Sequence, residues 1–138
     1  MLIKIIGRSK NKNEISGSPI VDREELKRLS TIREQFFQKG ATSDQKVEIR
    51  STLIKAFKIE GLNTFREAYD AISELFKISY YLICINESGL REGKRVTYSS
   101  EPALIQRITE DGRVCIKIED QSIKRKVLCV SPMMIKPA

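Results

Sequence analysis

The spacing of apolar residues divides the chain into two parts. Up to about residue 88 they recur every three or four positions, which is typical of helices with one buried stripe. From about residue 93 they recur at every second position within short segments, which is typical of strands. The pattern therefore predicts a helical part followed by a β part.

Two helices are expected before residue 62. The first covers Pro19–Lys39, with Asp22 placed to cap its N-terminus. The second begins at Ser43 or Asp44 and ends near Gly61. Its apolar surface is wide, which indicates burial between neighbouring elements.

A third helix has the clearest start signal. Thr64 and Glu67 have the spacing of a capping box, in which each side chain accepts a hydrogen bond from a backbone donor of the first turn. Apolar residues then keep the helical period as far as Ile83. The segment Ile78–Ile85 is also rich in β-branched and aromatic residues, which favour strands. We therefore expect the helix to end within Lys77–Glu87.

The β part is organised around the segment Arg113–Glu119, whose aliphatic residues alternate. We expect Val114, Ile116 and Ile118 to face inward. The preceding turn is Glu110–Gly112, and its length decides which residues meet across the hairpin. Further strands are expected at 95–99 and 125–130.

A three-residue loop, with Gly112 in the left-handed conformation, pairs apolar residues with apolar residues across this hairpin. It sets Ile108 against Val114 and Leu104 against Ile118, whereas a two-residue turn puts an isoleucine opposite an arginine. The longer loop also leaves three cations on the other face of the sheet: Arg107, Arg113 and Lys117.

The order of these segments resembles a known family of small barrels. It runs Gly-Lys-Arg-Val-Thr-Tyr from Gly93, Pro-Ala-Leu-Ile, a turn with Gly112, Val-Cys-Ile-Lys-Ile, a polar turn, Lys-Val-Leu, and then Pro132–Lys136. This layout is similar to SH3-like barrels of the KOW and Tudor type and to the C-terminal barrel of retroviral integrases, over residues 93–136. The resemblance implies a module that binds nucleic acid or protein segments without chemistry of its own. Tyr98 is the only aromatic after Tyr81, which argues against an aromatic cage.

The predicted fold class is α+β, an N-terminal helical layer of about three helices followed by a small five-stranded SH3-like β-barrel. We expect an N-terminal strand and basic arm at residues 1–20, a helical domain at 21–88 and the barrel at 89–138. The first six residues favour a strand that pairs with the barrel or with another chain.

The positive charge is concentrated at the two ends of the chain. The 25 Lys and Arg outnumber the 18 Asp and Glu, for a net charge of +7. Residues 1–20 hold four cations and one anion, residues 21–88 hold eleven of each, and residues 89–138 hold ten cations and six anions. This distribution predicts contact of the arm and the barrel with a polyanion, although net charge also serves solubility alone.

The candidate phosphate-binding residues follow from this distribution. Lysines that only protect a sheet edge, and an arm that is only a solvated linker, are the alternatives. The candidates in the barrel are Lys94, Arg95, Arg107, Arg113, Lys117, Lys124, Arg125 and Lys126, and those in the arm are Arg8, Lys10 and Lys12.

No catalytic constellation is visible in the sequence. It contains no histidine, no glycine-rich phosphate loop and no pair of cysteines at metal-ligand spacing, so we expect no enzyme, no metal and no cofactor. Cys84, Cys115 and Cys129 are expected to be free thiols in a reducing compartment. With no secretory or membrane segment, we expect a cytoplasmic protein without a small-molecule substrate.

Two functions from different classes fit these observations. The first is a non-catalytic nucleic-acid-binding protein, for DNA or RNA, that uses the basic barrel face and the arm on phosphates. The second is a protein-interaction adaptor or assembly factor that docks a partner or a second copy through the barrel or through the third helix, with Tyr69, Tyr80 and Tyr81.

Overall fold

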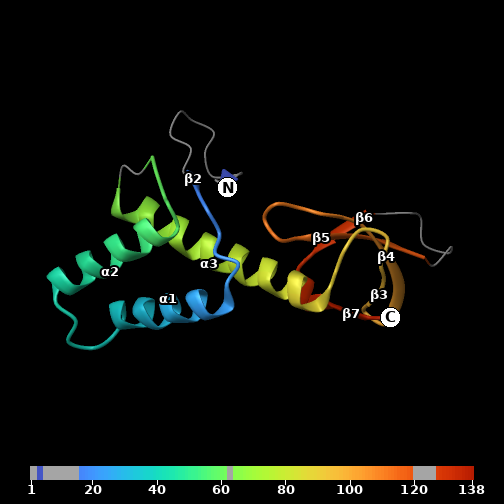
Figure 1. Cartoon of the computed structure of the whole chain (residues 1–138), viewed down its shortest axis with the longest axis horizontal. Coiled ribbons are helices and arrows are strands. Elements are labelled where there is room, and N and C mark those ends of the chain that lie inside the picture. The colour runs from blue at the N-terminus through green and yellow to red at the C-terminus, as the bar shows by residue number, and fades with distance from the viewer. Residues whose placement is uncertain (1–2, 5–15, 62–63, 120–126) are drawn as a thin grey trace. The chain divides into compact units, whose positions relative to one another are not determined.

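The computed structural model describes residues 3–4, 16–61, 64–119 and 127–138 (Figure 1). The chain forms two compact units, residues 1–80 and residues 81–138, which we call the helical unit and the sheet unit. The division falls within the longest helix, so that helix contributes residues to both units.

The helical unit contains α1 (Arg23–Phe36), α2 (Ser43–Ala56) and most of α3 (Phe65–Ser88). Helices α1 and α2 form an antiparallel hairpin (Figure 1). The apolar stripes of the three helices meet in one core, in which the rings of Phe57 and Phe76 pack edge to face with centroids 5.0 Å apart. Other buried residues of this core are Leu26, Leu29, Ile49, Leu53, Ala71, Ile72 and Leu75.

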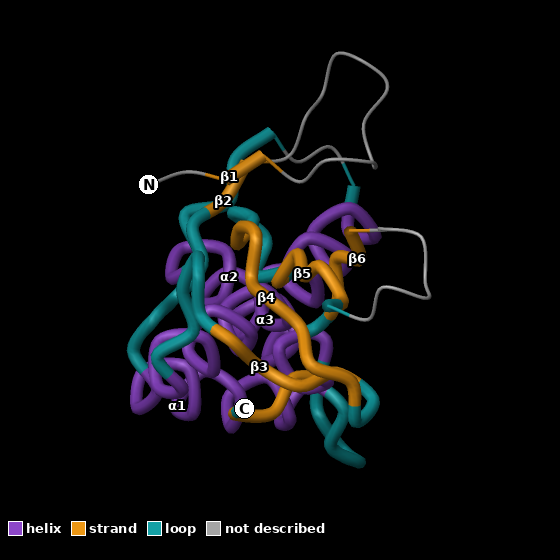
Figure 2. The backbone as a smooth tube through the Cα atoms, turned by 90° about the vertical axis from the view of Figure 1, so that its right-hand side faces the viewer, coloured by secondary structure: helices purple, strands orange, loops and turns teal. Residues whose placement is uncertain are grey.

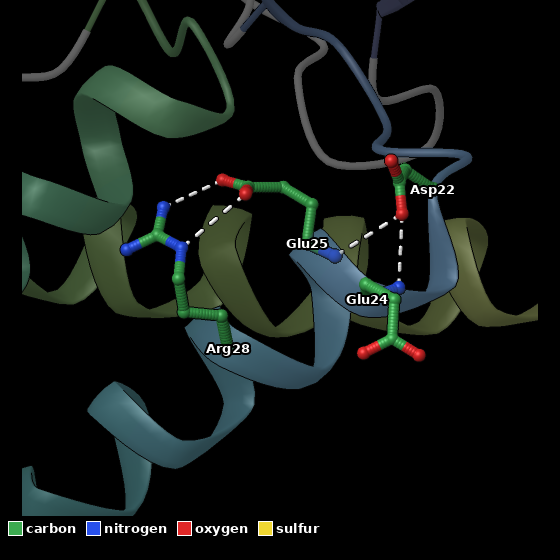
Figure 3. A network of polar contacts seen from close by, with 4 residues as sticks. All are labelled: Asp22, Glu24, Glu25 and Arg28. Carbon is green, nitrogen blue, oxygen red and sulfur yellow. Dashed lines mark hydrogen bonds and ion pairs between the residues drawn. The ribbon is translucent and has the colours of Figure 1, made fainter.

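Asp22 caps α1 as the sequence predicted, although the helix covers Arg23–Phe36 and not the whole of Pro19–Lys39. One carboxylate oxygen of Asp22 accepts hydrogen bonds from the backbone N–H groups of Glu24, at 2.9 Å, and Glu25, at 3.2 Å (Figure 3). These contacts satisfy two of the N–H groups that a helix leaves without an internal partner. Glu25 also accepts a hydrogen bond from Arg28, and this bond lowers the pKa of the Glu25 carboxyl below its usual value.

The starts of α2 and α3 are set by side-chain caps. Helix α2 begins at Ser43, one of the two expected positions, but it ends at Ala56 and not near Gly61. Thr42 and Gln45 form a complete capping box at its start, which the sequence did not single out. At α3, the hydroxyl of Thr64 accepts a hydrogen bond from the backbone of Glu67 at 3.1 Å, as expected. Helix α3 continues to Ser88, so the expectation that it ends within residues 77–87 was wrong by one residue.

The apolar tail of α3 stays helical because its residues are needed at helical spacing. Ile78 and Ser79 are buried residues of the helical unit, and Ile85 is buried in the core of the sheet unit. A strand would place successive residues on opposite faces and expose half of them. Burial therefore overrides the β preference of these side chains.

A short β-ladder lies at the start of the chain. Strand β1 (Ile3–Lys4) pairs antiparallel with β2 (Ser16–Gly17) in a two-stranded sheet of its own. Residues 3–4 therefore do not pair with the five-stranded sheet, whereas pairing of the N-terminal segment with another chain remains a prediction. Gly17 is buried, and a Cβ at this position would lie 2.5 Å from a methyl group of Leu75, so only glycine fits without a shift of the core.

The sheet unit is one antiparallel sheet of five strands in the order β6-β5-β4-β3-β7 (Figure 2). The strands are β3 (Arg95–Tyr98), β4 (Glu101–Ile108), β5 (Val114–Ile118), β6 (Val127–Val130) and β7 (Ile135–Pro137). A single 3-10 turn, η1 (Pro132–Met134), joins β6 to β7. The α+β class with helices first is confirmed, while closure of the sheet into a barrel remains a prediction.

The hairpin of β4 and β5 has the predicted loop but not the whole predicted register. Gly112 has a φ of +82°, and Ile108 lies opposite Val114, as expected. Between Ile105 and Arg107 the register shifts by one residue, so Leu104 lies opposite Lys117 instead of Ile118. A β-bulge of this kind leaves no signal in the alternation of the facing strand.

One face of the sheet forms the core of the sheet unit. Its fully or almost fully buried residues include Val96, Ala103, Ile105, Val114 and Ile116, which pack with Ile85 of α3. The inward direction predicted for Val114 and Ile116 is confirmed, and Ile118 is partly buried. Tyr98, Ile108, Leu128 and Ile135 cover the margins of this cluster.

The cysteine prediction was wrong for two of the three residues. Cys115 of β5 and Cys129 of β6 lie directly opposite each other, with Cα atoms 3.9 Å apart, and form a disulfide. Cys84 is a free thiol. The sequence gives these cysteines unrelated spacings, and only the pairing of β5 with β6 brings two of them together.

The buried hydroxyl of Ser79 provides a test of the helical unit. It accepts a hydrogen bond of 2.8 Å from the backbone N–H of Ile20 and is fully buried. The substitution Ser79→Ala leaves that donor without a partner, so we expect the free energy of unfolding to fall by about 1–3 kcal/mol. Urea denaturation followed by circular dichroism measures this change. Ser51→Ala on the exposed side of α2 is the control, and equal losses in the two variants would contradict the assignment.

Candidate nucleic-acid interface

The face of the sheet opposite its core, which we call the outer face, is built from rows of directly paired residues. One row crosses four strands and contains Arg95, Leu104, Lys117 and Val127. Because side chains of paired residues in a sheet point to the same side, Arg95 and Lys117 share this face.

The neighbouring row contains Arg107, Cys115 and Cys129. Arg107 lies on the outer face because it pairs with Cys115 in the register that the hairpin loop predicts. Arg113 comes two residues before Cys115, so the period of the strand places it on the same side. The bulge changes the residues before Arg107, and it brings Leu104 to the outer face beside Lys117.

A third row lies on the other side of Arg95. It contains Lys136 of β7, Thr97 of β3 and Pro102 of β4. The backbone N–H of Glu119 donates to the carbonyl of Pro102, which places Glu119 at the end of this row. The outer face therefore carries five described cations, which are Arg95, Arg107, Arg113, Lys117 and Lys136, and one described carboxylate, Glu119.

These cations are close enough for their fields to add. Neighbouring strands are about 5 Å apart and alternate residues along a strand are about 7 Å apart, so neighbouring cations of the outer face lie roughly 8–10 Å apart at their backbones. This distance is about one Debye length at physiological salt. The face therefore presents a joint positive potential rather than separate charges.

Glu119 neutralises part of this potential. Its carboxylate lies 3.5 Å from the Nε of Arg95, and the two side chains are 35% and 75% exposed. An ion pair with this much solvent contact contributes little to stability. Another anion, such as a phosphate, can therefore displace the Glu119 carboxylate from Arg95. The side chains of Arg107 and Arg113 are exposed.

The described outer face contains no aromatic side chain. Its uncharged members include Thr97, Pro102, Leu104, Val127 and the disulfide. Tyr98 lies on the core side, where it pairs with Glu101 and Ile135. The face therefore suits charged groups such as phosphates, and it offers no ring on which a base could stack.

The structure separates the predicted site residues into three groups. Arg95, Arg107, Arg113 and Lys117 come together on the outer face. Lys94 lies elsewhere: its ammonium group is 3.2 Å from the carbonyl of Ser88 and 3.4 Å from that of Gly89, at the C-terminus of α3. The other predicted residues lie outside the described part of the chain, namely Arg8, Lys10, Lys12, Lys124, Arg125 and Lys126.

Sequence reasoning missed Lys136 as a member of the outer face. Strand β7 has only three residues, too few for an alternating pattern, and its antiparallel pairing with β3 joins segments far apart in the chain. The sequence offers one hint, since alternation along a strand places Lys136 on the side opposite to Ile135. This hint requires knowing that Ile135 is partly buried, which only the structure shows.

Among the described residues, no group of three or more histidine, cysteine or acidic residues is placed to hold a metal ion. No described helix has the length and apolar character needed to cross a membrane. A groove of about 620 Å³ between α1 and α2 is lined mainly by polar residues, including Gln35, Gln38, Gln45, Glu48 and Thr52.

Comparisons of the chain with protein-family models, with curated proteins and with solved structures gave no match. The residues of the outer face are therefore the basis for a proposal about its function.

Lys94 and Arg107 are predicted to respond differently to neutralisation. Lys94→Gln removes a cation from the C-terminus of α3, so we expect a loss of about 0.3–1 kcal/mol in stability. It should leave the salt dependence of nucleic-acid binding unchanged. Arg107→Gln should do the opposite and lower the slope of log affinity against log salt by about one unit. Thermal unfolding and fluorescence anisotropy measure the two effects, and a flattened slope for Lys94→Gln would place Lys94 among the phosphate contacts.

Proposed function

We propose that this chain is a non-catalytic nucleic-acid-binding protein whose outer face contacts backbone phosphates. The observation that carries the proposal is the ratio of five cations to one carboxylate on one face of a five-stranded sheet. Guanidinium groups bind phosphate oxygens in a bidentate manner, and three of the five cations are arginines. The basic arm with Arg8, Lys10 and Lys12 is part of the proposal as an additional phosphate contact.

We also propose that the sheet unit is an SH3-like barrel. Two features support this: the strand order β6-β5-β4-β3-β7, and the 3-10 turn between the last two strands. In this arrangement the outer face is the exterior of the barrel wall. The KOW, Tudor and integrase barrels that this segment resembles bind nucleic acid or protein segments and carry no chemistry of their own. This agrees with a binding role here.

Recognition on this surface is expected to be independent of sequence. Phosphate contacts position a protein on nucleic acid but do not report base identity. The outer face lacks aromatic rings for stacking among its described members, so a preference for the regular backbone of a duplex or a structured RNA is expected over single strands. Binding should weaken steeply with salt.

A protein-interaction function is the second candidate, and one observation favours it. Phe37 and Tyr69 are 60% and 38% exposed, with ring centroids 6.1 Å apart, beside a small apolar pocket lined also by Phe36 and Ile72. Exposed aromatic pairs are enriched in protein interfaces. Tyr80, which is 41% exposed, belongs to the same proposal.

The cytoplasmic location remains a prediction, and the structure removes one of the two observations that supported it. Free thiols supported it, and the disulfide of Cys115 with Cys129 removes that support, since stable disulfides are rare in the cytosol. The nucleic-acid proposal does not depend on the compartment.

The first experiment compares binding of the purified chain to duplex DNA, single-stranded DNA and structured RNA, at low and near-physiological salt. Fluorescence anisotropy of labelled oligonucleotides gives the affinities, after co-purified nucleic acid has been removed. Binding that persists near physiological salt and prefers one class supports the proposal. Binding that is absent, or present only at low salt and equal for all three, would move the search to protein partners.

Charge reversal of two central cations tests the outer face directly. The double variant Arg113→Glu/Lys117→Glu should lower affinity on the order of 100-fold at about 0.1 M salt and reduce the salt slope by about two units, because two phosphate contacts are lost. The matched control is Lys27→Glu/Lys39→Glu, two exposed residues of the helical unit with the same change in net charge. If both double variants lose affinity equally, general charge and not the outer face is responsible.

Removal of the carboxylate should have the reverse effect. Glu119→Gln frees Arg95 from its ion pair, so we expect affinity to rise roughly two- to fivefold, the worth of an exposed ion pair. Glu110→Gln, in the exposed turn between β4 and β5, is the control for the change in net charge. An equal rise for both variants would show that the Arg95–Glu119 pair does not compete with phosphate.

A further inference from the structure

The disulfide between Cys115 and Cys129 is part of the outer face and has no role in the proposed phosphate binding. Its two residues form one row with Arg107, next to the row that contains Lys117. A disulfide that serves only to crosslink a sheet needs no cations around it. The arginine and lysine side chains around this disulfide therefore suggest that it reacts with anionic groups.

The two sulfur-bearing residues differ in accessibility. Cys115 lies on the inner strand β5 and is fully buried, with 0% of its surface exposed. Cys129 lies on β6, which is an edge strand of the described sheet, and is exposed. Thiol–disulfide exchange requires a thiolate to approach one sulfur in line with the bond that breaks. Of the two residues only Cys129 is exposed, so we expect the incoming thiolate to reach its sulfur, from the side of the sheet edge.

The surrounding charges select the attacking thiol. Arg107 lies directly across the ladder from Cys115, Lys117 is two residues further along β5, and Arg113 is two residues before it. A positive field raises the local concentration of anions and so speeds their encounter. It also stabilises the negative charge that develops on the departing sulfur of Cys115.

We propose that the Cys115–Cys129 disulfide is a thiol-exchange site, opened at Cys129 by small anionic thiols of the glutathione class. The incoming thiolate forms a bond to the sulfur of Cys129 while the bond between Cys129 and Cys115 breaks. The bonding electron pair leaves with the sulfur of Cys115, which then takes a proton from solvent. The product is a mixed disulfide at Cys129 and a thiol at Cys115.

A second molecule of the same thiol completes the reduction. Its thiolate attacks the sulfur of the attached small molecule, which releases a small-molecule disulfide and leaves Cys129 as a thiolate. Two electrons pass from the two small thiols to the protein disulfide, so no other reductant is needed. The site does not depend on nucleic-acid binding, although it uses the same cations.

The experiment uses the full chain with Cys84→Ser, so that the disulfide residues are the only cysteines. The oxidised protein is mixed with glutathione or with cysteamine, quenched with acid at short times and analysed by peptide mass spectrometry. Glutathione attacks as a doubly negative thiolate, whereas the cysteamine thiolate also carries an ammonium group and is neutral. We expect the adduct at Cys129. We also expect the ratio of the glutathione rate to the cysteamine rate, with both rates corrected for the thiolate fraction, to fall about tenfold between low salt and about 1 M salt.

Matched variants locate the charges. Arg107→Gln/Lys117→Gln should lower the low-salt rate ratio about three- to tenfold, whereas Lys27→Gln/Lys39→Gln in the helical unit should leave it unchanged. Because the adduct is mapped on a chain with both cysteines intact, the assignment does not depend on how a cysteine variant folds. Cys115→Ser is treated instead with glutathione disulfide. The thiolate of Cys129 attacks one of its sulfurs and releases one glutathione, and the adduct at Cys129 then persists because no neighbouring thiol can expel it.

Three results would overturn the proposal. The first is alkylation of both Cys115 and Cys129 in the air-oxidised chain, which would mean that the disulfide does not form. The second is an adduct mainly at Cys115. The third is a rate ratio that does not change with salt or with the outer-face variants. Nucleic-acid binding can fail in the experiments above while this site persists, and the reverse also holds, so the two proposals are tested separately.

Discussion

Burial of the apolar surface of α3 is the interaction on which both units depend. Its N-terminal two thirds provide Ala71, Leu75 and Phe76 to the core of the helical unit, and its last turns provide Ile85 to the core of the sheet unit. Removing large apolar side chains from water is the main source of stability in domains of this size. Because the buried residues recur at helical spacing over the whole length, the β-branched tail is held as helix.

The outer face is a consequence of how the sheet is paired. The core side of β3, β4 and β5 is filled by aliphatic residues, so every alternate position must face the other way. Within this constraint the hairpin loop places Arg107 on the same face as Lys117, and the bulge at Gln106 places Leu104 there as well. Charge repulsion among the cations is tolerable because they remain in solvent, and the ion pair of Arg95 with Glu119 offsets a part of it.

We propose two chemistries for the same surface, and they respond to different ligands. Phosphate binding needs only exposed cations and depends on ionic strength. Thiol exchange needs an accessible sulfur as well, and the edge position of β6 supplies it. A positive field helps both reactions because a phosphate and a small anionic thiolate are both drawn to it. The cations that would hold phosphates would therefore also influence how fast the disulfide is opened.

Local sequence signals determined much of the fold. The caps at Asp22 and Thr64 rest on hydrogen bonds within a few residues, and so does the loop with Gly112, which is why they were readable without a structure. Helical and alternating periods gave the α+β class for the same reason, since each residue's side is set by its neighbours along the chain. Thr42 was missed because two overlapping start signals lie at residues 42–45 and only the geometry chooses between them.

The tertiary structure decided what depends on residues far apart in the chain. The bulge at Gln106, the disulfide of Cys115 with Cys129 and the membership of Lys136 in the outer face all follow from strand pairing, which no local pattern specifies. It also removed Lys94 from the outer face, because the end of α3 offers its carbonyls to that ammonium group. The sequence by itself determined which residues are charged and which segments are helices or strands. Alternation within one hairpin also grouped Arg107, Arg113 and Lys117. Only the pairing of further strands added Arg95 and Lys136 to their face, because that pairing depends on register and burial and not on a local pattern.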